Sequence, residues 1–130
     1  MIEQKSFTPY PQEMLPQGFK YPESYLKLSQ STESIIPDEE LGFPWGFENY
    51  GTDGSEYAYQ HRIRDGLPHE ANNLIPFAHC CEWYAYFDGN DHSGNPRVFV
   101  VDLTDLPAHC WCEDFDEWLK DAINIAWYPS

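Results

Sequence analysis

The chain has 130 residues, with 22 acidic and seven basic side chains, and its formal charge at neutral pH is −15. This length fits one domain of ordinary size that can bury a core. Aromatic residues make up 17% of the chain, which is too many for a disordered acidic tail. The apolar runs are too short for a transmembrane helix, and the first residues lack the apolar run of a signal peptide. We therefore expect a globular domain in the cytoplasm.

The negative charge is concentrated after residue 30. Residues 1–30 carry three acids and three bases, whereas residues 31–130 carry 19 acids and four bases. Such a surplus repels nucleic acid and anionic membranes and attracts a basic partner. An acidic composition is also common in cytoplasmic domains that have no such partner, so both interpretations stay open.

The N-terminal part of the chain predicts little regular structure. Residues 1–20 are rich in proline and predict an extended lead-in held by aromatic side chains. Residues 22–31 begin with Pro22-Glu23 and predict a short helix. Residues 35–54 are interrupted by glycine and proline, so we expect an irregular segment, with short strands at most. Its aromatic anchors would be Trp45, Phe47 and Tyr50.

The middle of the chain predicts strands. Polar and aromatic side chains alternate along residues 56–63. This pattern is typical of a strand with Tyr57, Tyr59, His61 and Ile63 on one face. Residues 73–78 form a short apolar run, and the proline within it suits a sheet edge or a strand end. Residues 83–88 and 97–103 are apolar runs separated by a polar loop, and together they predict a β-hairpin.

The C-terminal segment predicts an amphipathic helix that Pro129 ends. Its apolar side chains recur at helical spacing and form one stripe: Phe115, Trp118, Leu119, Ala122, Ile123 and Ala126. The acids of its first turn are explained by the helix dipole: Glu113, Asp114, Asp116 and Glu117. The expected architecture is a single α+β domain over residues 1–130, a predominantly antiparallel sheet with this helix and a short N-terminal helix packed on it.

Two histidine-cysteine clusters are candidates for chemistry. They are His79-Cys80-Cys81 and His109-Cys110-Trp111-Cys112. Thiolate and imidazole are common zinc ligands, but adjacent cysteines on a strand point to opposite faces and cannot both face one ion. We therefore expect reduced, metal-free thiols. A small metal- or thiol-dependent enzyme that uses these clusters stays open as a less favoured alternative.

Other catalytic and metal-binding motifs are incomplete. Residues 69–73 begin like the zinc-protease motif His-Glu-x-x-His, but Asn73 stands where the second histidine is needed. Residues 88–99 begin like a calcium loop, but Phe99 stands where the final glutamate is needed. We expect no catalytic residue, no cofactor and no nucleic-acid binding.

Four segments carry a family resemblance. They read Leu-Ile-Pro-Phe-Ala at 74–78, Trp-Tyr-Ala-Tyr-Phe-Asp at 83–88, Arg-Val-Phe-Val-Val-Asp at 97–102 and Phe-Asp-Glu-Trp-Leu at 115–119. With Tyr-Pro-Glu-Ser-Tyr-Leu at 21–26, this order resembles the SUKH superfamily. The resemblance implies an α+β domain without catalytic residues or cofactor. Many bacterial members are immunity proteins that neutralise a toxin, often a nuclease, and a fungal branch includes a regulator of cell-wall synthesis.

The favoured hypothesis is therefore a non-catalytic, cytoplasmic immunity protein that binds a basic toxin. A regulatory or adaptor domain of the same fold is the alternative, and the sequence specifies no oligomeric state. The candidate partner contacts are acids on strand ends or loops between aromatic residues: Asp53, Glu56, Glu82, Asp88 and Asp91.

Overall fold

The computed structural model describes residues 7–30, 45–62, 67, 71–80, 82–104 and 109–123. Within these ranges, five strands form one antiparallel sheet in the order of the chain. The strands are β1 (Gly46–Phe47), β2 (Leu74–Cys80), β3 (Trp83–Asp88), β4 (Val98–Asp102) and β5 (His109–Cys112). The helices are the 3-10 turn η1 (Gln12–Met14), α1 (Glu23–Gln30), α2 (Asp53–Gln60) and α3 (Phe115–Ile123). The predicted α+β fold with a C-terminal helix on the sheet is confirmed.

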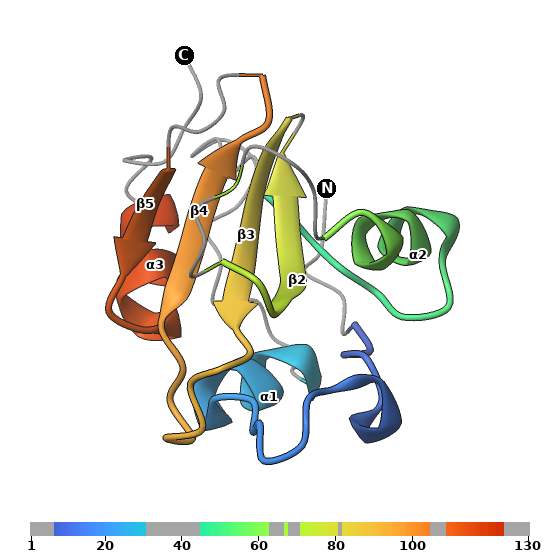
Figure 1. Ribbon diagram of the computed structural model, residues 1–130, viewed down its shortest axis with the longest axis vertical. Coiled ribbons are helices and arrows are strands. Elements are labelled where there is room, and N and C mark those ends of the chain that lie inside the picture. Colours follow the sequence, from blue (N-terminus) through green and yellow to red (C-terminus); the bar gives the residue numbers. More distant parts are fainter. Residues whose placement is uncertain are drawn as a thin grey trace.

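The helices occupy different places around the sheet (Figure 1). Helix α3 lies behind the sheet in this view and α1 lies beneath its lower end, and the buried side chains of both helices share one core cluster with the strands. Helix α2 stands apart, beside β2, and buries Ala58 against a second, smaller cluster on the other face of the sheet. None of the helices in the described ranges is long and apolar enough to cross a membrane.

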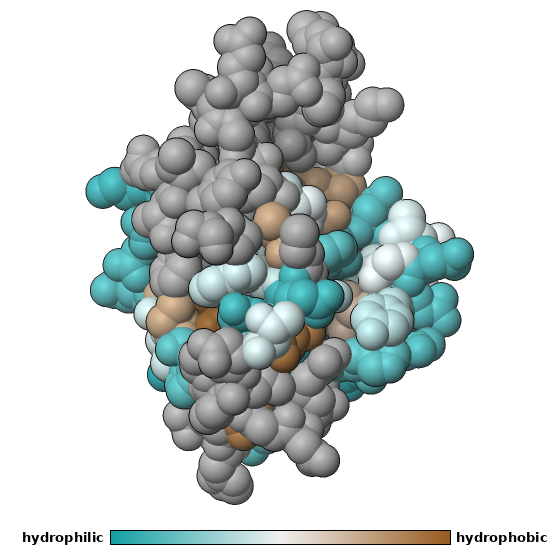
Figure 2. Space-filling model, turned by 90° about the horizontal axis from the view of Figure 1, so that it is seen from above, coloured by the Kyte–Doolittle hydropathy of each residue, from teal (hydrophilic) through white to brown (hydrophobic). Residues whose placement is uncertain are grey.

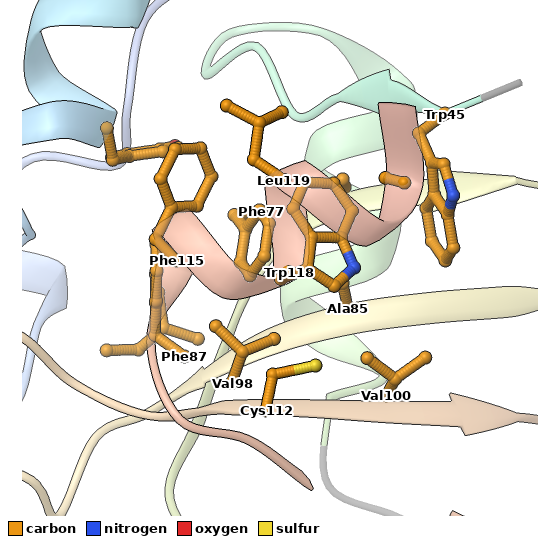
Figure 3. Packing of buried hydrophobic residues seen from close by; sticks show 14 of the residues in the cluster. Trp45, Phe77, Ala85, Phe87, Val98, Val100, Cys112, Phe115, Trp118 and Leu119 are labelled. Carbon is orange, nitrogen blue, oxygen red and sulfur yellow. The ribbon is translucent and has the colours of Figure 1, made fainter. Parts of the chain in front are cut away.

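The larger core is built around Trp118 of α3 (Figure 3). This side chain is 0% exposed, and its ring meets Phe77 of β2 edge-on, with ring centroids 4.8 Å apart. The ring of Trp45 lies 5.3 Å away on another side. The rest of the predicted stripe is buried in the same core: Phe115, Leu119 and Ala122. The stripe is therefore confirmed for these residues, while the side chain of Ile123, and residues 126 and 129, lie outside the described part.

Several local predictions are confirmed. Helix α1 lies within residues 22–31, and β3 pairs antiparallel with β4 as a hairpin. The lead-in is anchored by buried aromatic side chains, among them Tyr10 and Phe19. Pro76 lies in β2 beyond the two residues that pair with β1, so a missing backbone N–H is tolerated there.

The prediction of a strand over residues 56–63 is wrong, because residues 53–60 form helix α2. The helix begins at Thr52, whose Oγ1 accepts a hydrogen bond of 3.3 Å from the backbone N–H of Ser55. Tyr57 and Tyr59 therefore differ in environment: Tyr57 is 54% exposed, whereas Tyr59 is half-buried. Ile63 lies outside the described residues. Strand β5 is an element that the sequence analysis did not predict.

Candidate functional site

Asp88 is the last residue of β3 and Asp91 lies in the loop between β3 and β4, and both carboxylates are used within the chain. Asp88 is 4% exposed, and its Oδ2 accepts a hydrogen bond of 3.0 Å from Nε of Arg97. Asp91 accepts hydrogen bonds from the backbone N–H groups of Ser93 and Arg97. Burial opposes ionisation of Asp91, but these hydrogen bonds outweigh it and lower the pKa of the carboxyl group. Both acids therefore stabilise the hairpin loop.

Glu82 lies at the other end of β3, exposed in the turn that follows β2. Asp88 lies six positions further along an extended strand, which at about 3.3 Å per residue is about 20 Å. Glu82 and Asp88 therefore lie at opposite ends of β3. Asp53 and Glu56 lie together on α2, and Asp88 and Asp91 lie together around Arg97.

Asp53 and Glu56 are both exposed in the first turn of α2. Their spacing of three residues puts them on the same side of the helix. The turn also places their negative charge near the positive end of the helix dipole. The described residues of α2 include no base in its last turn. Helix α2 thus presents two carboxylates together at the surface.

A hollow of about 520 Å³ lies beside these acids, between α2, the loop after β1 and the lead-in. We call it the tyrosine hollow, because each of these three segments contributes one tyrosine: Tyr59, Tyr50 and Tyr10. The ring centroid of Tyr10 lies 5.1 Å from that of Tyr59 and 6.1 Å from that of Tyr50. The other lining residues are Met14, Gly51, Ser55, Glu56 and Gln60. Hydrophilic side chains gather on this side of the molecule, at the right of Figure 2 where α2 projects in Figure 1.

Hydrogen bonds hold two of the tyrosine rings in place. The hydroxyl group of Tyr10 donates to the carbonyl oxygen of Ser55 at 2.5 Å, and that of Tyr59 donates to the carbonyl oxygen of Met14 at 2.7 Å. Burial, reinforced by the carboxylate of Glu48, raises the pKa of Tyr10 far above its usual value. Both phenol protons are therefore engaged, and the hollow offers ring surface and the Glu56 carboxylate to a ligand.

The two histidine-cysteine clusters lie on β2 and β5, with β3 and β4 between them. Three strand spacings of about 4.8 Å put Cys80 and Cys110 about 14 Å apart, and a disulfide needs Cα atoms within about 7 Å. Cys110 and Cys112 are free thiols, and Cys81 lies outside the described residues. Burial raises the pKa of Cys110 to about 11 and that of Cys112 to about 12. These two thiols are therefore protonated at neutral pH and are poor nucleophiles and metal ligands.

A buried acid and a half-buried histidine form a pair at the β1 edge of the sheet, and the sequence analysis missed it. Glu48 is 3% exposed, and its Oε2 lies 2.6 Å from Nδ1 of His79. This hydrogen bond raises the pKa of His79, against the opposing effect of burial. The pairing of Gly46 with His79 in the sheet brings the two side chains together. Among the described residues, no group of three or more potential metal ligands forms at this pair or elsewhere.

The sequence analysis also missed the tyrosine hollow. Tyr10 and Tyr59 are 49 positions apart, and their rings meet only because residues 53–60 are helical. The one local signal was Thr52-Asp53, an N-cap followed by an acid, which marks a helix start.

A comparison of the chain with protein-family models, with curated proteins and with solved structures finds no match.

Proposed function

We propose that this chain is a non-catalytic protein-binding domain that binds a basic partner protein. The binding surface, which we call the α2 surface, consists of Asp53, Glu56, Tyr50, Tyr57 and the tyrosine hollow. The observation that carries the proposal is that two exposed carboxylates stand beside aromatic rings, with Tyr50 46% exposed and Tyr57 54% exposed. Protein interfaces are enriched in tyrosine, and clustered charge of one sign steers a partner of the opposite sign.

The role we propose for this binding is immunity: in the cytoplasm, the domain covers the active site or substrate groove of a basic toxin, such as a nuclease. Two considerations support this role. The four segments named above resemble the SUKH superfamily, and the formal charge of −15 disfavours binding to nucleic acid itself. The adaptor role is the alternative, and it predicts binding without protection from a toxin.

The first test is protection. The immunity role predicts that a toxin is encoded beside this gene, and that cells producing this toxin survive when they also produce the chain. Death of the cells despite a stable complex would favour the adaptor role. The absence of any complex with that toxin, in cells or with purified proteins, would refute the immunity proposal.

The second test locates the surface by the kinetics of association. The association rate should fall about tenfold or more from about 50 to about 500 mM salt, because salt screens steering between charges. The double variant Asp53→Asn/Glu56→Gln should associate more slowly at low salt. A matched control is Glu113→Gln/Asp116→Asn, which removes the same charge from the start of α3. Equal rates for the two double variants would remove the α2 surface from the proposal.

A further inference from the structure

The tyrosine hollow differs from an ordinary surface depression in its chemistry. Three aromatic rings form its walls, Glu56 contributes a carboxylate, and its described lining contains no basic side chain. Its volume of about 520 Å³ is within the range of sites that take a small ligand or one long side chain. The Glu56 carboxylate is held by its neighbour, because Nε2 of Gln60 donates a hydrogen bond of 3.2 Å to Oε1.

The chain itself shows that one of these rings accepts a guanidinium group. The guanidinium carbon of Arg62 lies 3.8 Å from the ring centroid of Tyr59, and Nη1 donates a hydrogen bond of 2.6 Å to the carbonyl oxygen of Tyr59. Arg62 lines a neighbouring hollow, together with Leu15 and Asn73, and does not line the tyrosine hollow. Within the described part of the chain, Arg62 therefore covers one face of the Tyr59 ring from outside the tyrosine hollow.

The geometry points to a binding site for the guanidinium group of an arginine side chain of the partner protein. This inference rests on the proposed function, because it names the side chain that the α2 surface receives. The faces of aromatic rings attract cations, and Tyr50, which is 46% exposed, offers an accessible ring in the lining of the tyrosine hollow. A planar guanidinium stacks on a ring and donates two parallel hydrogen bonds to one carboxylate, which an ammonium group does not. Arginine is therefore preferred to lysine.

The test needs no partner protein. Nα-acetylarginine amide is titrated into the isotope-labelled chain and followed by NMR, with Nα-acetylcitrulline amide as the neutral probe of the same shape. The arginine probe should cause saturable shifts in the backbone signals of Tyr50, Gly51, Ser55 and Glu56, with a millimolar dissociation constant. The citrulline probe should bind at least about fivefold more weakly, and the corresponding lysine probe should fall between the two.

Two variants place the probe in the hollow. Tyr50→Ala and Glu56→Gln should each weaken binding of the arginine probe about threefold or more. Both residues are exposed, so both variants should retain the spectrum of the folded protein. Glu82→Gln is the matched control, because it removes one exposed charge at a distance from the hollow, and it should leave binding unchanged.

Three results would overturn the inference: no saturable shift with the arginine probe, equal binding of the citrulline probe, or equal effects of Glu56→Gln and Glu82→Gln. Stronger binding of the lysine probe would overturn the choice of guanidinium. The outcome is separable from the proposed function. If the chain neutralised its toxin but did not bind the arginine probe, the proposed function would stand and this site would be refuted. If the chain bound the probe but no protein, the site for a guanidinium group would stand and the proposed function would be refuted.

Discussion

Replacing Trp118 with alanine should lower the free energy of unfolding by about 3–5 kcal/mol. The side chain is 0% exposed, and its ring lies against Phe77, Trp45 and Phe115. A buried tryptophan removes about 150–250 Å² from water, which at about 25 cal/mol per Å² amounts to about 4–6 kcal/mol. Its indole N–H is buried without a hydrogen-bond partner among the described residues. The variant no longer buries this donor, which reduces the loss of stability by about 1–3 kcal/mol. The cavity left by the ring destabilises the variant and so cancels part of this reduction.

The assay is urea unfolding followed by circular dichroism, in which the midpoint should fall while the slope stays constant. Trp118→Phe keeps an aromatic ring in the core and removes the unpaired N–H, so it should cost less than about 2 kcal/mol. Leu26→Ala on the exposed side of α1 is the control and should cost less than about 1 kcal/mol. If Trp118→Ala left the midpoint unchanged but abolished partner binding, α3 would be a docking element and the core assignment would be refuted.

Three further predictions concern the hairpin loop, His79 and the thiols. Asp88→Asn should lower the free energy of unfolding by about 1–3 kcal/mol in the same assay, because Arg97 loses a buried carboxylate; an unchanged midpoint would contradict this role. The pKa of His79 is raised in the folded state above its ordinary 6.5, so the stability from its pair with Glu48 should be complete below that pH and lost as the pH rises through the raised value. His79→Gln should therefore abolish this loss of stability with rising pH. If the free energies of unfolding of the variant and the wild type changed with pH in parallel, this role of His79 would be contradicted. In a variant whose other cysteines are alanine, Cys110 should react with iodoacetamide at pH about 7.5 at least about thirtyfold more slowly than an unfolded control, because its pKa is about 11; equal rates would show an accessible thiolate.

The sequence alone determined those elements whose signal is local and periodic. Phe115, Trp118, Leu119 and Ala122 recur at helical spacing and are buried on α3. The apolar runs on either side of the loop at residues 89–96 predicted the β3–β4 hairpin for a similar reason, since a polar loop between two strand-forming runs favours their pairing. The α+β fold class followed from the order of these elements.

Only the tertiary structure decided the nature of residues 53–60. Their alternation of tyrosines with small or polar residues fits a strand, yet the segment also follows a good N-cap at Thr52. Contacts with remote residues favour the helix, because Ala58 is buried in the cluster on the second sheet face and Tyr59 donates its hydroxyl proton to Met14, 45 positions away. A local pattern contains no information about either contact.

The candidate site depended on the tertiary structure for the same reason. Composition indicated an acidic surface. It did not distinguish the paired carboxylate of Asp88 from the exposed carboxylates of Asp53 and Glu56, because the pairing depends on where Arg97 lies in space. The tyrosine hollow draws its walls from residues 10–14 and 50–60, two segments that are remote in the sequence and meet only in the folded chain. Periodicity reveals which face of one element is buried, whereas a site built between elements exists only once their packing is known.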